Sequence, residues 1–594
     1  MQFANLFPVP FNQVHLSDGF WAQRKHTVRK NTAVVCLDQC DRTGRVSNFL
    51  RAAKLEEGGF EGIYFNDSDV YKVLEGVAYV LMEGGDDALA RRADQVIDAI
   101  CAAQLDDGYL YTYYTLTGLE KRWTDMAYHE AYCLGHMIEG AIAYAQATGK
   151  DKWLRTAIRA VEQMMDVFGP GKRHWVTGHQ EIELALVRLY RYTGDARFLE
   201  FAEFLVDERG HGHLVSEEFD RIGFNEAYCQ DDLPARELSR VTGHAVRAMY
   251  YYSAMADIAS IRQDEKLAEA LEKLWANVSP GNLYITGGIG QSSDNEGFTE
   301  DFSLPNLTAY CETCASIGMA LWNQRMNLMT GDAKYADLVE REMYNGILAG
   351  ISLDGKKFFY DNPLSSVGKY NRSEWFGCSC CPTNLVRFIP SVAGYAYATS
   401  GKRLYVNQFI PGEATIAVEG GTIEMSVETA YPYGEQVSIF VRKAPNGATL
   451  CIRRPGWCAG YQCSVNGQAK DADVLDKGYL LTPVHDGDRV EITVAMPVRL
   501  THCDERVKEN IGRVAVEKGP FVFCAEEIDN PGRVREYFHA FKELHTGATI
   551  QAHHDDDMLG GVDVVDIGDT RLIPYYVWNN RGKGAMAVWL REKR

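Results

Sequence analysis

Two short stretches of the chain gather cysteine and carboxylate side chains that could bind a metal ion or attack an electrophile. The stretch WFGCSCCPTN places Cys378, Cys380 and Cys381 within four positions, and TAYCETC, further upstream, supplies Glu312 and Cys314. Zinc in proteins takes four ligands from Cys, His and carboxylate side chains. Two close pairs, far apart in the sequence and unlike the CxxC pairs of a zinc ribbon, would supply four such ligands: Glu312, Cys314, Cys380 and Cys381.

Each of these pairs lies where a helix is expected to begin. Thr313 is a favourable N-cap residue, so a helix that starts one residue later would hold Glu312 just outside it. Pro382 suits the first helical position, which places Cys380 and Cys381 at a second helix N-terminus. The helix dipole at such a position favours a thiolate. Spacing alone leaves three interpretations open: buried unreactive thiols, a structural zinc site, or a reactive centre.

Three histidines also lie near predicted helix starts. His129 occurs in YHEAYCLGH, while His179 in TGHQEIELAL and His244 in VTGHAVRAMY each follow a glycine. A single histidine of this kind is more often a buried or capping residue than a ligand-binding one. Three of them in successive helical units favour a polar ligand site, provided that the helix starts meet at one rim.

A glycine- and serine-rich stretch upstream of Glu312, GGIGQSSDNEGFTEDFSLPN, adds further carboxylates. It contains Asp294, Glu296, Glu300 and Asp301. Such acidic loops are usually only solvated. The functional alternative is a general acid that reaches over a bound sugar.

The hydrophobic pattern up to about residue 400 is helical and predicts the element that must position these residues. Amphipathic segments such as QEIELALVRLYRYTGD alternate with short turns in which Gly149, Gly194 and Gly331 are expected C-caps. About six helix pairs would fit in this length, which predicts an (α/α)6 barrel over residues 1–400. An open solenoid and an irregular helical domain are the alternatives.

Beyond residue 400 the pattern becomes that of strands. Segments such as EQVSIFVRKA and RVEITVAMPVRL are separated by Gly, Pro and Asn-Gly turns. We expect a β-sandwich domain at residues 401–504 and a second one at residues 505–594.

Composition excludes several classes of partner and of chemistry. The formal net charge of −20 argues against a nucleic acid or an anionic membrane, because both attract basic patches. No run approaches the roughly 18 apolar residues of a membrane span. Fifteen cysteines without a signal-peptide pattern favour the reducing cytoplasm. The chain lacks GxxxxGK[ST], GxGxxG and GxSxG motifs, which disfavours nucleotide, dinucleotide and serine-hydrolase chemistry.

Over essentially the whole chain, the sequence resembles glycoside hydrolase family 127, the β-L-arabinofuranosidases. The resemblance rests on GFTEDFSLPN, YCETCASIGMAL, WFGCSCCPTNLVRFI, FNDSDVYK, GHQEIELAL, GHAVR and AVEKGPFVFCAEE. It implies an (α/α)6 barrel catalytic domain followed by two β-sandwich domains. Gln180 departs from the family pattern, because a proline is expected after His179.

The resemblance also implies roles for individual residues. Cys380 would be the nucleophile and Glu296 the acid/base. Zinc would be held by Glu312, Cys314, Cys380 and Cys381. The substrate would be bound by His129, His179, His244 and Tyr360.

The implied function is an exo-acting retaining glycosidase that releases β-L-arabinofuranose from short arabino-oligosaccharides or glycoconjugates. Retaining glycosidases normally pair two carboxylates, and here a metal-bound thiolate would replace the nucleophilic one. Three alternatives remain: hydrolysis of another rare sugar such as an aceric acid residue, a non-catalytic zinc-stapled sugar-binding protein, or a metal-free helix-barrel enzyme such as a sugar epimerase or unsaturated-glycuronide hydrolase. A homodimer formed through the sandwich domains is also possible.

Overall fold

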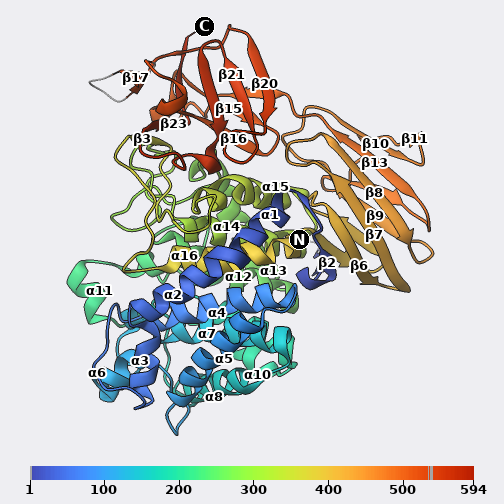
Figure 1. Ribbon diagram of the computed structural model, residues 1–594. Coiled ribbons are helices and arrows are strands. Elements are labelled where there is room, and N and C mark those ends of the chain that lie inside the picture. Colours follow the sequence, from blue (N-terminus) through green and yellow to red (C-terminus); the bar gives the residue numbers. More distant parts are fainter. Residues whose placement is uncertain (1–2, 533, 536–539, 594) are drawn as a thin grey trace.

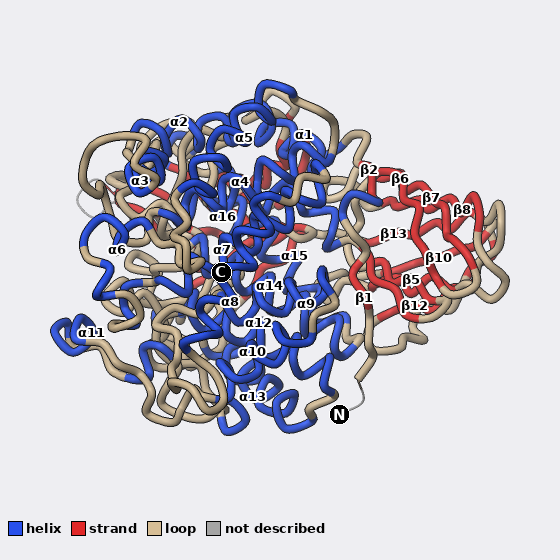
Figure 2. The backbone as a smooth tube through the Cα atoms, turned by 90° about the horizontal axis from the view of Figure 1, so that it is seen from below, coloured by secondary structure: helices blue, strands red, loops and turns tan. Residues whose placement is uncertain are grey.

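The computed structural model describes residues 3–532, 534–535 and 540–593. The chain forms a helical domain followed by two strand-rich domains, one beside it and one above it in the view of Figure 1. Figure 2 shows the helices gathered on one side of the molecule and the strands of the middle domain on the other. In the described part of the chain, no helix has the length and apolar character needed to cross a membrane.

Six helices form a closed inner ring. Each packs against the next, and the last packs against the first: α4 (Asp67–Met82), α7 (Glu130–Thr148), α9 (Ile182–Thr193), α12 (Ala245–Arg262), α14 (Thr313–Thr330) and α16 (Cys380–Phe388). Helices in such a ring are covered on almost every side. In α12, for example, every residue from position 245 to 259 is buried.

A second set of helices lies outside this ring. These are α2 (Ala33–Arg42), α5 (Asp87–Ala102), α8 (Lys152–Val167), α10 (Ala196–Asp207), α13 (Glu265–Gly281) and α15 (Ala333–Arg341). Each buries one apolar stripe, as Trp153, Ala157 and Val161 do in α8. The predicted C-caps Gly149, Gly194 and Gly331 all adopt the left-handed conformation. The (α/α)6 barrel expected from the sequence is confirmed.

The middle domain contains two sheets that share one hydrophobic core. The five-stranded sheet has the order β1 (Phe7–Pro8), β4 (Tyr397–Ser400), β5 (Arg403–Val406), β9 (Thr449–Arg453) and β12 (Tyr479–Pro483). The seven-stranded sheet has the order β11 (Gln468–Ala469), β10 (Tyr461–Val465), β13 (Arg489–Val494), β8 (Gln436–Lys443), β7 (Gly421–Thr429), β6 (Gly412–Val418) and β2 (Val14–His15). Two short strands from the N-terminus, β1 and β2, therefore complete the edges of sheets formed mainly by residues beyond 396.

The C-terminal domain contains a connected ten-stranded sheet. Its strands are β3 (Ser365–Val367), β14 (Val498–Thr501), β15 (Arg513–Lys518), β16 (Phe521–Glu526), β19 (Leu544–His545), β20 (Ile550–Asp555), β21 (Val562–Ile567), β22 (Thr570–Pro574), β23 (Ala585–Ala587) and β24 (Leu590–Lys593). A separate pair consists of β17 (Val534–Arg535) and β18 (Ala540–Phe541). Strand β3 comes from the helical part of the chain and pairs with β23, where Ser366 lies opposite Met586.

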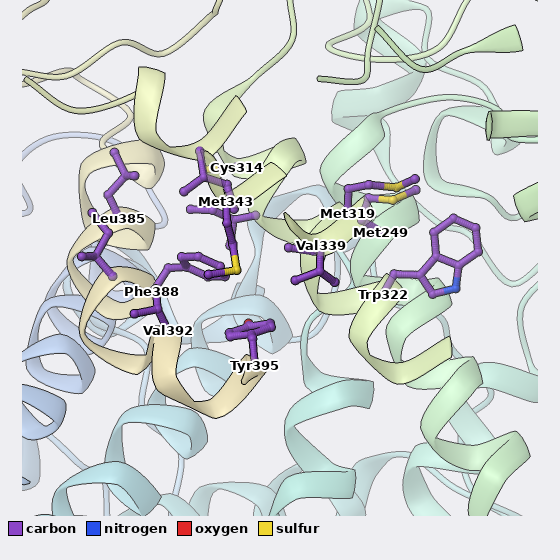
Figure 3. Close-up of a cluster of buried hydrophobic side chains, with 14 of the residues drawn as sticks. Met249, Cys314, Met319, Trp322, Val339, Met343, Leu385, Phe388, Val392 and Tyr395 are labelled. Carbon is purple, nitrogen blue, oxygen red and sulfur yellow. The ribbon is translucent and has the colours of Figure 1, made fainter. Parts of the chain in front are cut away.

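The helices that begin at the cysteine motifs differ slightly from the prediction. Helix α14 begins at Thr313, whose hydroxyl donates to the carbonyl of Phe359 at 3.0 Å instead of capping the helix. Helix α16 begins at Cys380, two residues before Pro382. Figure 3 shows part of the core around these helices, with Phe388 of α16 among the labelled apolar side chains. The prediction that Glu312 lies just outside a helix, and that two thiols lie at a helix start, is confirmed.

Candidate active site

The starts of the six inner helices surround one pocket. Its lining includes a residue at, or within a few positions before, the start of each helix: Phe65, His129, His179, His244, Glu312 and Cys380. Because each outer helix leads the chain back, the inner helices all begin at the same rim. The cavity has a volume of about 260 Å³, just below the roughly 300–1,000 Å³ of typical ligand sites. A pocket of this size suits one sugar unit better than a long chain.

Two of the histidines are presented by the same four-residue sequence, Val-Thr-Gly-His. A Cβ atom at Gly178 would lie 2.1 Å from the carbonyl oxygen of Met126. A Cβ atom at Gly243, which has a φ of +66°, would lie 2.1 Å from the carbonyl oxygen of Ala227. Glycine is therefore required in both turns, and the close backbone contacts fix the positions of the histidines that follow.

The three histidines form a continuous row of buried rings. The centroids of His129 and His179 lie 5.4 Å apart, and those of His179 and His244 lie 5.6 Å apart. Burial, together with the charge of Arg247, lowers the pKa of His129 to about 3. Burial also lowers the pKa of the other two rings. Neutral imidazoles can donate to and accept from sugar hydroxyls without the cost of burying a charge.

Glu296 lies in the acidic loop, at a turn that is held in place. The backbone of Glu296 has a φ of +50°, and its carbonyl oxygen accepts from the N–H of Ala245 at 3.0 Å. Its Oε1 accepts from the Tyr310 hydroxyl at 2.9 Å, and its Oε2 lies 3.0 Å from Nε2 of His244. Since Nδ1 of His244 accepts from the N–H of Val246 at 3.1 Å, the ring proton lies on Nε2 and points at the carboxylate. Although the loop is rich in glycine and serine, Glu296 itself is anchored by these contacts.

These contacts set the ionisation state of Glu296. Burial acts to raise the pKa of this carboxyl group, but the hydrogen bonds from His244 and from the Tyr310 hydroxyl lower it to about 2. Glu296 is thus a carboxylate in the free protein. In this state it is ready to act as a base.

The four predicted metal ligands come together from the starts of α14 and α16. Cys380 Sγ lies 3.3 Å from Oε1 of Glu312. Cys381 Sγ lies 3.7 Å from the same oxygen and 3.4 Å from Sγ of Cys314. All four ligand atoms lie within 4.8 Å of one another.

This donor set fits a bound cation. The second oxygen of Glu312, Oε2, is buried and has no hydrogen-bond partner. Burial raises the pKa of Glu312 well above its usual value, and nearby Cys380 and Glu296 raise it further. A positive ion in the middle of the group would give the unpaired oxygen a partner and would favour the ionised form of Glu312. Thiolate, imidazole and carboxylate are the ligand types that zinc accepts. The cluster could therefore hold a metal ion.

Two further side chains lie beside this cluster. The Tyr360 hydroxyl lies 3.2 Å from Sγ of Cys380 and 3.5 Å from Sγ of Cys378. Cys378 lines the pocket but does not belong to the group of four. Among those four, Cys380 is the most exposed thiol, at 9%, whereas Cys381 is fully buried. Cys380 is thus the thiol of the cluster that is best placed to meet a ligand in the pocket.

A buried polar network supports the cluster from below. Asn384 donates to Sγ of Cys314 at 3.1 Å, and its own Oδ1 accepts from Nε of Arg387 at 2.7 Å. Arg387 is in turn paired with Glu75 at 3.1 Å. The sequence analysis did not identify Asn384, although it lies four residues after Cys380, on the same helix face.

The pocket also contains residues that the sequence analysis missed. Arg247 lines the pocket and follows His244 by three residues, so it lies on the same face of α12. Tyr310, two residues before Glu312, does not line the pocket but contacts Glu296, which does. The pocket walls are largely aromatic and apolar: Ile63, Tyr64, Phe65, Tyr132, Phe219, Ile222, Phe224 and Tyr228. No spacing rule indicated the segment around Phe219, because it lies outside the inner ring.

Gln180, the departure from the family pattern, has a defined structural role. Its side-chain amide donates to the carbonyl of Cys229 at 2.7 Å and to Gln230 at 3.1 Å. The backbone carbonyl oxygen of Gln180 lies 2.8 Å from Nδ1 of His179. Gln180 therefore ties the turn that carries His179 to the neighbouring turn at residues 229–230.

Comparisons with known proteins give matches to one enzyme family in all three domains. Residues 13–394 match the profile of the GH127 β-L-arabinofuranosidase catalytic domain. Residues 403–497 match the middle domain, and residues 498–591 match the C-terminal domain, of the same family. A non-reducing end β-L-arabinofuranosidase of Bifidobacterium longum subsp. longum is 36% identical, over 92% of each chain.

Solved structures show the same relationship. A GH127 β-L-arabinofuranosidase from Geobacillus stearothermophilus T6 superposes with a TM-score of 0.92 at 37% identity, covering 98% of this chain and 100% of the other. Another GH127 β-arabinofuranosidase gives a TM-score of 0.92 at 39% identity, over 99% and 98% of the two chains. The chain is therefore a member of glycoside hydrolase family 127, the β-L-arabinofuranosidase family.

Proposed function

We propose that this protein is a non-reducing-end β-L-arabinofuranosidase that acts with retention of configuration through Cys380. The observation that supports this most directly is that Cys380 and Glu296 line the same pocket, together with three neutral histidines. A single small pocket favours exo-action on a terminal residue. The activity itself is inferred from β-L-arabinofuranosidases that this chain resembles.

The nucleophile is assigned to Cys380 because it lines the cavity and is the most exposed thiol of the cluster. A thiol attacks well only as a thiolate. A zinc ion held by Glu312, Cys314, Cys380 and Cys381 would supply the positive charge that favours this form. Cys380 lies in the first turn of α16, where the helix N-terminus adds to the effect.

In the first step, the sulfur of Cys380 bonds to the anomeric carbon while the glycosidic oxygen takes a proton and leaves. We assign the delivery of that proton to Glu296, the carboxyl group on the acidic loop that lines the pocket. Because Glu296 is a carboxylate in the free protein, it must be protonated once substrate is bound. A sugar that excludes water from the pocket promotes this, since burial raises the pKa of Glu296.

In the second step, Glu296 removes a proton from water, and the oxygen of this water displaces the sulfur of Cys380 from the sugar. The resting hydrogen bonds from His244 and Tyr310 hold the carboxylate in this basic form. The sugar itself is positioned by His129, His179 and His244, with Tyr360 beside the sulfur. The products are free arabinose and the regenerated thiolate.

The proposal is tested by hydrolysis of a chromogenic β-L-arabinofuranoside, compared with its α-anomer and with other pentosides, with and without a zinc chelator. Hydrolysis of the β-L-arabinofuranoside alone, lost on chelation and restored by zinc, is expected. Equal hydrolysis of several pentosides, or full activity after the metal has been removed, would contradict the proposal.

A further inference from the structure

Away from the pocket, three potential metal ligands converge beside the C-terminus of α10. His174 lies between α8 and α9, Glu208 directly follows α10, and His213 lies in the next loop. Nδ1 of His174 lies 2.8 Å, and Nε2 of His213 lies 3.0 Å, from the same oxygen of Glu208, Oε2. One ligand atom of each residue lies within 4.8 Å of the others.

We propose that His174, Glu208 and His213 form a second metal site, which binds a divalent transition-metal ion. Two imidazole nitrogens and one carboxylate oxygen suit Zn²⁺, Co²⁺ or Ni²⁺. Three protein ligands leave the remaining coordination positions to water. The site would therefore bind its ion exchangeably, unlike the closed cluster at Cys380.

The electrostatic setting favours a cation at this point. Glu208 caps the C-terminus of α10, where the free carbonyl groups give the helix end a partial negative charge. Its side chain is only 16% exposed, whereas those of His174 and His213 are 50% and 32% exposed. The carboxylate is thus held in the protein while the two imidazoles stay accessible to an ion from solution.

A bound ion would join two segments that lead to the pocket. Arg209, directly after Glu208, is buried and donates to the carbonyl of Thr177 at 2.8 Å and to that of Cys229 at 2.8 Å. Thr177 lies between His174 and His179 in the sequence. The ion would therefore add a second connection between the end of α10 and the backbone that carries His179.

The native metal content of the purified enzyme is measured first. The enzyme is then titrated with Co²⁺, and binding is followed by calorimetry and by visible absorption. The variants are His174→Ala and His213→Ala, and the matched control is His485→Ala. His485 is 75% exposed and lies 3.4 Å from Asp488. Among the described residues, it belongs to no group of three or more side chains that could hold a metal ion. Absorption from Co²⁺ bound by nitrogen and oxygen lacks the thiolate charge-transfer bands that exchange into the cysteine cluster would produce.

We expect the wild type and His485→Ala to bind one further equivalent of Co²⁺, with an affinity at least about tenfold higher than that of His174→Ala or His213→Ala. Equal affinity in all four proteins, or no binding beyond the native metal in the wild type, would overturn the proposal. All three substituted side chains lie at the surface, so the variants are expected to fold. Either result leaves the assignment of Cys380 and Glu296 untouched.

Discussion

The sulfur of Cys380 lies 3.3 Å from a carboxylate oxygen of Glu312, so the proposed nucleophile and the one oxygen ligand of the cluster are direct neighbours. These residues come from the starts of two different inner helices, α14 and α16. Their separation is therefore fixed by helix packing in the barrel and not by a flexible loop. A carboxylate ligand would also donate less charge to a bound cation than a fourth thiolate would, which suits the proposed role of Cys380 as a nucleophile.

Replacing Cys380 with serine should abolish turnover while the protein stays folded. A hydroxyl group is not deprotonated near neutral pH, so the rate should fall by on the order of 10⁴-fold or more, as for other lost nucleophiles. The measurement is kcat/KM with a chromogenic β-L-arabinofuranoside, beside a thermal unfolding curve.

Cys378→Ser is the matched control for this variant. Cys378 lines the same pocket and contacts the same Tyr360 hydroxyl, but it is outside the metal group. It should keep most of the activity. Comparable losses in the two serine variants would show that the pocket needs both thiols and that Cys380 has no special role.

Replacing Glu296 with glutamine should reveal the acid role through the leaving group. The loss should be about 10²- to 10⁴-fold for a sugar leaving group, which needs a proton. A nitrophenolate leaves without taking a proton, so for this leaving group the loss of rate in the first step should be much smaller. Kinetics with a series of aryl and alkyl arabinofuranosides measure this difference. An equal loss across the series would assign Glu296 to substrate binding instead.

Replacing Tyr310 with phenylalanine should raise the pKa of Glu296. The Tyr310 hydroxyl donates to this carboxylate at 2.9 Å and helps to lower the pKa to about 2. The limb of the pH–rate profile that Glu296 controls should therefore move to higher pH. Measurement of kcat/KM against pH shows the shift, and an unchanged or downward-moving limb would be inconsistent with this hydrogen bond.

The same pKa predicts how stability depends on pH. Because the folded-state pKa of Glu296 is below its ordinary value of 4.5, the carboxylate stabilises the fold above that pH. This contribution is lost as the pH falls from about 4.5 toward 2. In Tyr310→Phe the contribution should be smaller and its loss should be complete at a higher pH, which urea unfolding at a series of pH values can detect.

Replacing Asn384 with alanine should weaken metal binding without removing a ligand. Its amide donates to Sγ of Cys314 at 3.1 Å, and changes to such supporting residues typically cost 10- to 100-fold in metal affinity. Competition with a chelator measures the affinity. Asn323→Ala is the matched control, since Asn323 is a buried amide of α14 that bonds to Met319 and Trp275 instead. It should lose stability but keep its metal affinity.

Much of the barrel and of the site could be predicted from the sequence. The C-cap glycines and the apolar periodicity are local signals, and the structure confirms the helix ring that they indicated. The two Val-Thr-Gly-His turns and the two cysteine motifs are also local. We predicted that these motifs meet at one site from a single assumption about the topology, namely that the inner helices all begin at the same rim of the barrel. The roles assigned to the individual residues stay predictions.

Other features depend on contacts between distant segments and left no local signal. Strand β1 pairs Phe7 with Thr399, although the two-residue strand is too short for a periodic pattern. The hydrogen bond between His244 and Glu296 joins a helix cap to a loop about fifty residues away, and only the folded barrel brings them together. The apolar part of the pocket wall around Phe219 belongs to a segment outside the inner ring of helices. The hydrophobic periodicity of the sequence does not indicate where this segment lies.

The most direct test of the account is the identity of the residue that bonds to the sugar. The enzyme would be treated with a slow-reacting β-L-arabinofuranoside that carries a good leaving group, quenched in acid, digested and examined by mass spectrometry. The account predicts one pentosyl group on the peptide that contains Cys380, absent from Cys380→Ser. A pentosyl group on a carboxylate such as Glu312, or inversion of the product anomer with no adduct at all, would contradict it.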